Sequence, residues 1–200
     1  LLLRIFSMSG ENIGIIPARG GSKGVPLKNL RLLNDLPLVV YGILCSLKSP
    51  SIDRTVVSTD HDKIAEVAEQ YGAEVIMRPP ETATDEAPTE PAMKHVVETL
   101  ENNGVEVENI ALIQATCPFR LAADVEEGFA ILKSGKGDAV MSVSSVPAHF
   151  HPYWLKSVTS SGHLASLYQE DDIPHDILET KRYWRRQDLP GAYYWKNGYL

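Results

Sequence analysis

The segment IIPARGGSKGVPLKN, residues 15–29, places three cations on a loop with three glycines, directly after an apolar run. The cations are Arg19, Lys23 and Lys28, and the chain that carries them is acidic, with a formal net charge of −7. A glycine-rich turn after a strand brings backbone N–H groups close to an anion. Arginine adds paired hydrogen bonds to a phosphate, and lysine adds a compact charge. The segment therefore predicts a phosphate-binding loop, with a solvated surface turn as the alternative.

Two common phosphate-binding loops do not match this segment. The ATPase loop requires Gly-Lys-Ser/Thr, and here Gly24 and Val25 follow Lys23. The dinucleotide loop requires G-x-G-x-x-G at the start of a helix, which Pro26 and the neighbouring cations disfavour. A cationic cradle for phosphate is the interpretation that remains.

Outward from this loop, short apolar runs alternate with amphipathic ones. Strands are predicted at 12–17, 54–59, 73–77, 110–114 and 138–146, and helices at 37–49, 61–71, 122–134 and around Met93, Val96, Val97 and Leu100. This alternation indicates a three-layer α/β fold, in which a mostly parallel, Rossmann-like sheet has helices on both faces. Because such sheets bind ligands beyond the carboxyl ends of their strands, the loops after residues 17, 58, 77 and 114 are expected along one rim.

Composition limits the classes of partner. The net charge of −7 argues against binding to nucleic acid or to an anionic membrane surface, since both require a basic field. No stretch has the apolar length of a membrane span or the pattern of a signal peptide. The two cysteines, Cys45 and Cys117, have no metal-ligand spacing, so we expect a reduced, cytoplasmic setting.

The last quarter of the chain differs from the rest. All three tryptophans and six of the eight tyrosines lie beyond residue 150, where several prolines make long helices improbable. Aromatic enrichment of this kind suits a subunit contact. A second small core is the alternative, because aromatic side chains are often simply buried.

The opening segment resembles the signature of the acylneuraminate cytidylyltransferases, the CMP-sialic acid synthetases. That family has Pro-Ala-Arg, a small residue, Gly-Ser-Lys-Gly and, after a gap, Lys-Asn. Further matches follow in order at VVSTD (56–60), YGAEVIMRP (71–79), ATDEAPT (83–89), LIQATCPFR (112–120), RQDLP (186–190) and NG (197–198). The resemblance spans residues 12–198 and implies a fold of the nucleotide-diphospho-sugar transferase type.

The resemblance also implies a reaction and a set of site residues. The anomeric hydroxyl of a sialic-acid-like sugar acid attacks the α-phosphorus of CTP and releases pyrophosphate, a step in cell-surface polysaccharide biosynthesis. By resemblance, the triphosphate is held by catalytic Arg19, Lys23 and Lys28 and by the main chain of Gly20, Gly21 and Ser22, with Asn29 at the ribose or base. By the same resemblance, Arg78 reads cytosine, Gln114 contacts the sugar, and Arg186 reaches a neighbouring subunit's site in a homodimer, with a solvated charge as the alternative for Arg186.

The implied cofactor is Mg²⁺, which suits a triphosphate because it prefers hard oxygen ligands. In the family, two aspartates separated by one residue hold it, well beyond the Asn-Gly strand. The sequence ends at Leu200, before such a pair, so its metal ligands are left unassigned. The expected organisation is an N-terminal extension at 1–11, a nucleotide-binding core at 12–146, a dimerisation and sugar-side excursion at 147–190, and a return strand at 191–200.

Several alternatives stay open at this point. Ala115 and Cys117 stand where many family members have Pro and Ser, so the acid is not fixed: legionaminate, pseudaminate and octulosonate are alternatives to sialic acid. A non-catalytic nucleotide-binding module is the alternative from another class. Among other polar residues, Asp60 and Asp85 are expected as helix N-caps, His95 as structural, and His149 and His151 as weak metal candidates.

Overall fold

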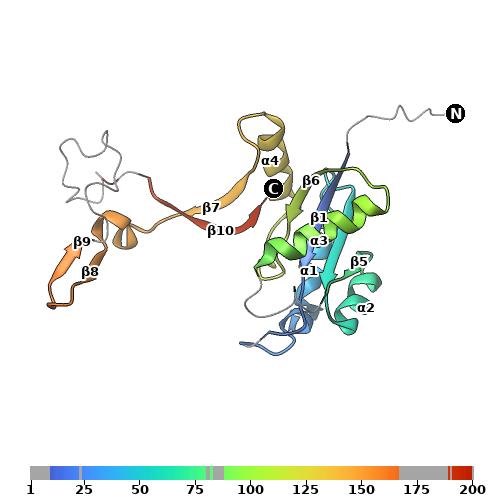
Figure 1. The fold of residues 1–200 in the computed structure, drawn as a ribbon, viewed down its shortest axis with the longest axis horizontal. Coiled ribbons are helices and arrows are strands. Elements are labelled where there is room, and N and C mark those ends of the chain that lie inside the picture. Colours follow the sequence, from blue (N-terminus) through green and yellow to red (C-terminus); the bar gives the residue numbers. More distant parts are fainter. Residues whose placement is uncertain are drawn as a thin grey trace. The chain divides into compact units, whose positions relative to one another are not determined.

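The structure is a computed structural model and describes residues 10–22, 24–79, 82, 88–166, 189 and 191–199. The chain forms two compact units, Leu1–Met141 with Asn197–Leu200, and Ser142–Lys196. A sheet between helices makes up the first unit, and short strands and single helical turns make up the second (Figure 1). In the described part of the chain, no helix combines the length and the apolar character that crossing a membrane requires.

Parallel strands build the sheet of the first unit. Their order is β5 (Glu74–Met77), β4 (Arg54–Thr59), β1 (Glu11–Pro17) and β6 (Val107–Leu112). In the register, Ile15 of β1 lies opposite Val56 of β4 and Leu112 of β6. The last strand, β10 (Tyr193–Tyr199), pairs antiparallel with β6 through Tyr199 and Leu112.

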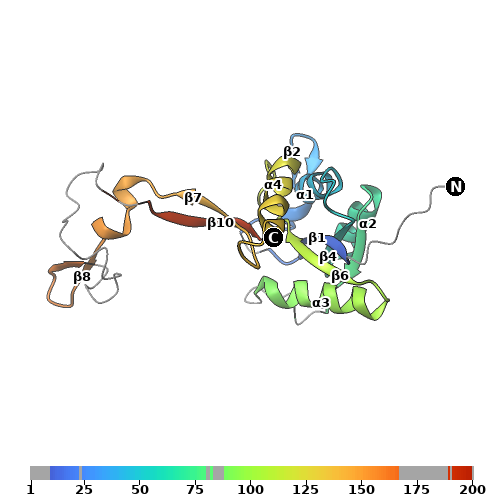
Figure 2. The same cartoon turned by 90° about the horizontal axis from the view of Figure 1, so that it is seen from above.

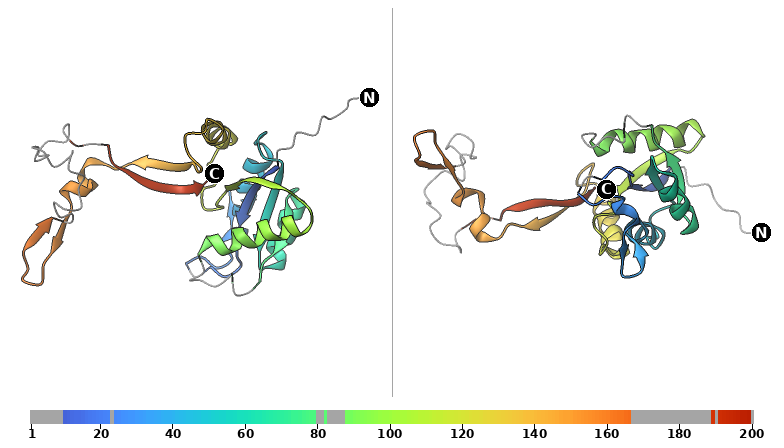
Figure 3. Two further views of the ribbon diagram at one scale, coloured as in Figure 1. Left: turned by 45° about the horizontal axis from the view of Figure 1, so that its top comes forward. Right: turned by 90° about the horizontal axis from the view of Figure 1, so that it is seen from below.

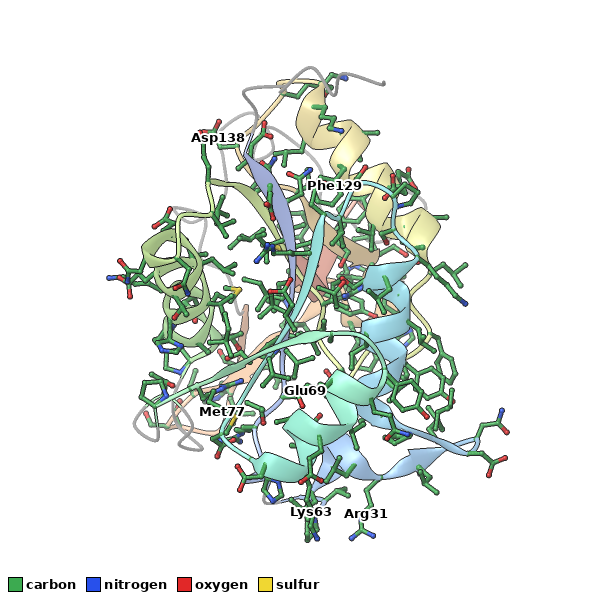
Figure 4. All side chains as sticks on the ribbon, turned by 90° about the vertical axis from the view of Figure 1, so that its right-hand side faces the viewer. Arg31, Lys63, Glu69, Met77, Phe129 and Asp138 are labelled. Carbon is green, nitrogen blue, oxygen red and sulfur yellow. The ribbon has the colours of Figure 1, made fainter. Side chains whose placement is uncertain are left out.

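Helices cover both faces of this sheet. On one face lie α1 (Leu38–Leu47), α2 (Asp62–Gln70) and α4 (Ala122–Lys133), and on the other lies α3 (Thr89–Asn102) (Figure 2). Successive residues of β1 point to opposite faces, so Ile16 packs with Phe129 of α4, while Ile15 packs with Val96 of α3. Figure 4 shows Phe129 on the inner side of α4 and Lys63 at the outer surface of α2. The three-layer α/β fold with a mostly parallel sheet is confirmed.

Glycines end two of these helices. Gly72 and Gly104 follow α2 and α3 with φ of 88° and 81°, a region that favours glycine. Ala73 N–H donates to the carbonyl of Ala68, and Gly72 N–H donates to that of Glu69. This pair of bonds is the Schellman arrangement, which gives partners to carbonyls at the end of a helix.

A small hairpin follows the cationic loop, and the sequence analysis did not predict it. Its strands are β2 (Leu32–Leu33) and β3 (Leu36–Pro37), and they pair antiparallel. Asn34 and Asp35 form the turn with φ of 48° and 69°. Asn and Asp tolerate this left-handed backbone better than other residues, which suits them to a two-residue hairpin turn.

The second unit consists of short elements (Figure 3). Strand β7 (Met141–Ser145) neighbours β10 in its sheet. Two single turns of 3₁₀ helix, η3 (Ala148–Phe150) and η4 (Pro152–Trp154), precede the antiparallel hairpin of β8 (Lys156–Val158) and β9 (Leu164–Ser166). Most of the remainder of the expected dimerisation excursion, 167–188, lies outside the described residues.

Candidate active site

A cavity of about 270 Å³ lies where β1, β5 and β6 end, and the start of α3 contributes to its wall. It is lined by Pro17, Arg19, Ser22, Lys28, Asn29, Arg78, Thr82, Pro88, Thr89, Gln114, Ala115 and Thr116. Three of these described residues are cations and none is a carboxylate, so the cavity presents positive charge. Of the four loops expected at the rim, those after residues 17, 77 and 114 line it.

Most of the site residues predicted from the sequence meet in this cavity. Those that line it are Arg19, Ser22, Lys28, Asn29, Arg78 and Gln114. Gly20 and Gly21 belong to the same loop as Arg19, whereas Lys23 and Arg186 lie outside the described residues. Thr89 and Thr116 also line the cavity, and the sequence analysis gave them no role. The individual roles of all these residues stay predictions.

The turn at Gly20 is fastened to the end of β4. Ala18 N–H donates to the carbonyl of Ser58 at 2.9 Å, and Gly20 N–H donates to Asp60 Oδ1 at 2.8 Å. The His61 ring lies so close that a Cβ on Gly20 would come within 2.6 Å of its Cδ2 atom. Only glycine fits there without a shift of the surrounding structure.

The other two glycines of the loop have free space around them. A Cβ added to Gly21 or Gly24 would meet no atom within 4 Å. The packing requirement inside this glycine-rich loop therefore falls on Gly20, and the other two positions tolerate a methyl group sterically.

Side chains of the loop hold its own main chain in place. The Ser22 hydroxyl donates to the Val25 carbonyl at 2.6 Å and accepts from Lys28 N–H at 3.1 Å. Asn29, which is buried, donates from Nδ2 to the Arg19 carbonyl at 3.0 Å. These bonds fix the backbone at both Arg19 and Lys28 before any ligand arrives.

Leu27 has a left-handed backbone with φ of 47°, directly before the 3₁₀ helix η1 (Lys28–Leu30). The Cβ atom of a non-glycine residue disfavours this conformation by about 1–2 kcal/mol. Its carbonyl nevertheless accepts from Leu30 N–H at 2.9 Å, which closes the turn that carries Lys28. Local strain next to a cationic cavity is consistent with a functional constraint on the loop.

Arg78 follows β5 and is buried, with 8% of its surface exposed. Its Nη2 donates to the Ser58 carbonyl at 2.6 Å, and its Nη1 lies 3.5 Å from the Thr82 carbonyl. Burial lowers the pKa of Arg78, the Asp60 carboxylate raises it, and the Arg19 charge lowers it further. The Nε atom is buried without a partner among the described residues. Arg78 thus joins the segment after β5 to the end of β4 and lines the cavity.

The expectation that Asp60 is the N-cap of α2 is wrong. His61 occupies the N-cap position, and its side chain makes no capping bond. Asp60 lies one residue too early, and its Oδ1 instead accepts from Gly20 N–H. Asp85, the other expected cap, lies outside the described residues.

Among the described residues, no three or more His, Cys, Asp or Glu side chains gather into a group that could hold a metal ion. His151, a weak metal candidate from the sequence, accepts from Tyr153 N–H at its Nδ1 atom. His95 lies on α3, and its buried Nδ1 has no hydrogen-bond partner in the described part of the chain.

Known proteins resemble this chain over most of its length. The CMP-N,N'-diacetyllegionaminic acid synthase of Legionella pneumophila is 37% identical over 164 residues, which cover 80% of this chain and 69% of that protein. The N-acylneuraminate cytidylyltransferase of Escherichia coli is 38% identical over 138 residues. These cover 68% of this chain and 32% of the Escherichia coli protein, so the match spans about a third of that relative.

A solved structure and a family-level match agree with these relatives. The structure of CMP:2-keto-3-deoxy-manno-octonic acid synthetase complexed with CTP shares the fold, with a TM-score of 0.67 at 20% identity over 94% of this chain and 73% of that one. The sequence pattern of the cytidylyltransferase family matches residues 13–193. The resemblance found in the loop motifs is therefore confirmed, and the chain belongs to the cytidylyltransferase family.

Proposed function

We propose that this protein transfers the CMP group of CTP to a sialic-acid-like sugar acid and releases pyrophosphate. The observation that carries this proposal is the cavity at the strand ends, where Arg19, Lys28 and Arg78 line one space of about 270 Å³. Such a cluster in an acidic chain concentrates positive charge where a polyanion would bind.

The proposed reaction needs positioning and charge neutralisation more than covalent help. The anomeric hydroxyl oxygen of the acid bonds to the α-phosphorus as its proton is lost. The bond from that phosphorus to the oxygen bridging to the β-phosphate breaks, and pyrophosphate leaves with the electron pair. In-line transfer of this kind depends on fixed geometry and on cations around the leaving group. The fixed backbone at Arg19 and Lys28 suits both residues to that task.

Arg78 and Gln114 are proposed for the two organic ends of the substrates. Gln114 follows β6 and lines the cavity, and its amide can both donate to and accept from sugar hydroxyls. The guanidinium of Arg78 offers donors to the O2 and N3 acceptors of cytosine. The names of the relatives support a nonulosonic acid as the acceptor, and the octulosonate of lipopolysaccharide is the related alternative.

The test is a substrate panel on the protein as it stands. Purified protein is incubated with CTP, Mg²⁺ and, in parallel, N-acetylneuraminate, N,N'-diacetyllegionaminate, pseudaminate or 2-keto-3-deoxy-octonate. Pyrophosphate release and a CMP-sugar product with one acid support the proposal. CTP binding without release for any acid would instead support a non-catalytic nucleotide-binding module.

We also propose Mg²⁺ as the cofactor, because a triphosphate needs hard counter-ions. Its ligands among the described residues are not assigned. If the proposal holds, activity in the panel should vanish with EDTA and return with excess Mg²⁺. A cytoplasmic location is proposed with it, supported by the free thiol of Cys45.

A homodimer is proposed from the surface of the second unit. Large apolar side chains that are half or more exposed there are Val143, Phe150, Val158, Leu164, Tyr193 and Tyr194. Exposed aromatic and apolar side chains of this kind are what a contact surface between proteins would cover. Light scattering of the full chain should give twice the monomer mass, and a monomer across the concentration range would refute the dimer and the shared role of Arg186.

A further inference from the structure

We infer that Asp60 is a positioning residue of the proposed active site, which holds the turn at Gly20 and through it the Arg19 side of the cavity. The inference rests on the proposed function, since it assigns a task within the triphosphate loop. Asp60 itself does not line the cavity, and its effect is expected through the loop that it holds.

The carboxylate lies where three strand ends meet. Asp60 directly follows β4, and its Oδ1 accepts from Gly20 N–H at 2.8 Å in the loop after β1. Its charge also acts on Arg78, which follows β5 and whose pKa it raises against the effect of burial. One side chain therefore acts on the loops at both neighbouring strands.

Two further contacts restrict the turn at Gly20. The His61 ring leaves no room for a Cβ on Gly20, and Asn29 Nδ2 holds the Arg19 carbonyl at 3.0 Å. Both polar groups of the Arg19–Gly20 peptide are therefore hydrogen-bonded. The carbonyl accepts from Asn29, and the N–H donates to Asp60. A catalytic group misplaced by about 1 Å can cost about 10²-fold in rate.

Position and charge are separable at this residue. In Asp60→Asn, the side-chain carbonyl can still accept from Gly20 N–H, whereas the negative charge is lost. Asp60→Ala removes both the acceptor and the charge. A positioning role predicts that Asn restores most of what Ala loses, because the hydrogen bond does the positioning.

The experiment compares Asp60→Ala and Asp60→Asn with Glu66→Ala, which removes an exposed carboxylate on α2 and should leave activity unchanged. We expect kcat/KM for CTP to fall about 100-fold in the Ala variant and to stay within about fivefold of wild type in the Asn variant. Amide exchange at Gly20, followed by NMR, should accelerate in the Ala variant alone. Equal loss in both Asp60 variants would overturn the inference, because the charge would then be what matters.

Two further measurements keep this test separate from the proposed function. Binding of inorganic pyrophosphate, measured by calorimetry, should weaken about tenfold or more in Asp60→Ala relative to Asp60→Asn, whether or not any acid is a substrate. If wild type turns over no acid but this order of binding and exchange holds, the proposed function fails and the positioning role stands. If Asp60→Ala does not fold, Gly20→Ala, which pushes against His61, should reproduce its loss of pyrophosphate affinity, and an unchanged affinity would refute the role.

Discussion

The loops after β1 and β6 both reach the cavity, and different contacts shape them. In the first, the side chains of Asp60 and Asn29 hydrogen-bond the N–H and the carbonyl of the Arg19–Gly20 peptide. In the second, the loop closes on itself, with Cys117 N–H donating to the carbonyl of Gln114 at 3.0 Å.

This difference suggests how one scaffold serves several substrates. A loop whose main chain is held by side chains, here Asn29 of the loop itself and Asp60 after β4, loses those contacts when these residues change, which suits the proposed triphosphate loop. A loop closed through its main chain keeps that bond when its side chains change, as the proposed sugar-side loop would require. Ala115 and Cys117, the departures from the family pattern, lie in this second loop.

The largest expected effect comes from removing a cation of the first loop. Lys28→Ala should lower kcat by about 10²–10³-fold, the usual cost of losing one preorganised donor to the transition state. The matched control is Lys63→Ala, at an exposed lysine on α2 (Figure 4). The rate of pyrophosphate release gives kcat for each variant. A kcat of Lys28→Ala within a few-fold of wild type would contradict a catalytic role for the first loop.

A ligand of the first loop should stabilise the whole unit. Pyrophosphate at about 100 times its Kd should raise the free energy of unfolding by about 2.7 kcal/mol, because it binds the folded chain alone. Thermal unfolding with and without pyrophosphate measures this gain. At the same pyrophosphate concentration, the gain should be smaller in Lys28→Ala, because its Kd is higher. An equal gain in both proteins would show that the anion binds at another site, and it would contradict the assignment of the triphosphate to the first loop.

The second loop is expected to affect the acid and not the nucleotide. Gln114→Ala should raise KM for the sugar acid about tenfold, the scale of one lost hydrogen bond, and leave KM for CTP within twofold. Initial rates over a matrix of both substrates separate the two constants. A rise in KM for CTP of the same size would show that the two loops do not divide the substrates.

The smallest effect concerns strain in the first loop. Leu27→Gly should stabilise the protein by about 0.5–1 kcal/mol, since relief of the left-handed backbone exceeds the entropy that glycine adds to the unfolded chain. Urea unfolding of Leu27→Gly and of Val25→Gly makes the test, because Val25 is a neighbour without a positive φ. A midpoint that falls in both variants would mean that Leu27 stores no strain.

Local patterns in the sequence predicted the fold well. The strand at 12–17 and the helix at 61–71 match β1 and α2 within one residue at each end, because burial on a sheet imposes a period on each segment. The hairpin of β2 and β3 was missed because two-residue strands carry no period. Its signal was the turn pair Asn34 and Asp35 between Leu33 and Leu36.

The residues that line the candidate cavity were more predictable than the contacts that hold them. Arg19, Lys28, Arg78 and Gln114 line one cavity because strand ends in a parallel sheet share an edge. The bond from Gly20 to Asp60 joins residues forty positions apart, and the local sequence around Asp60 favoured a helix cap instead. Contacts between loops depend on how the strands align, which the local sequence does not show. The helix cap expected at Asp60 lies one residue later, at His61.

A single oxygen atom ties two of these loops together. The Ser58 carbonyl accepts from Ala18 N–H in the loop after β1 and from Arg78 Nη2 in the segment after β5. A carbonyl has two lone pairs, and here each has its own donor. A shift of either loop would therefore disturb the other loop's bond to the same carbonyl oxygen.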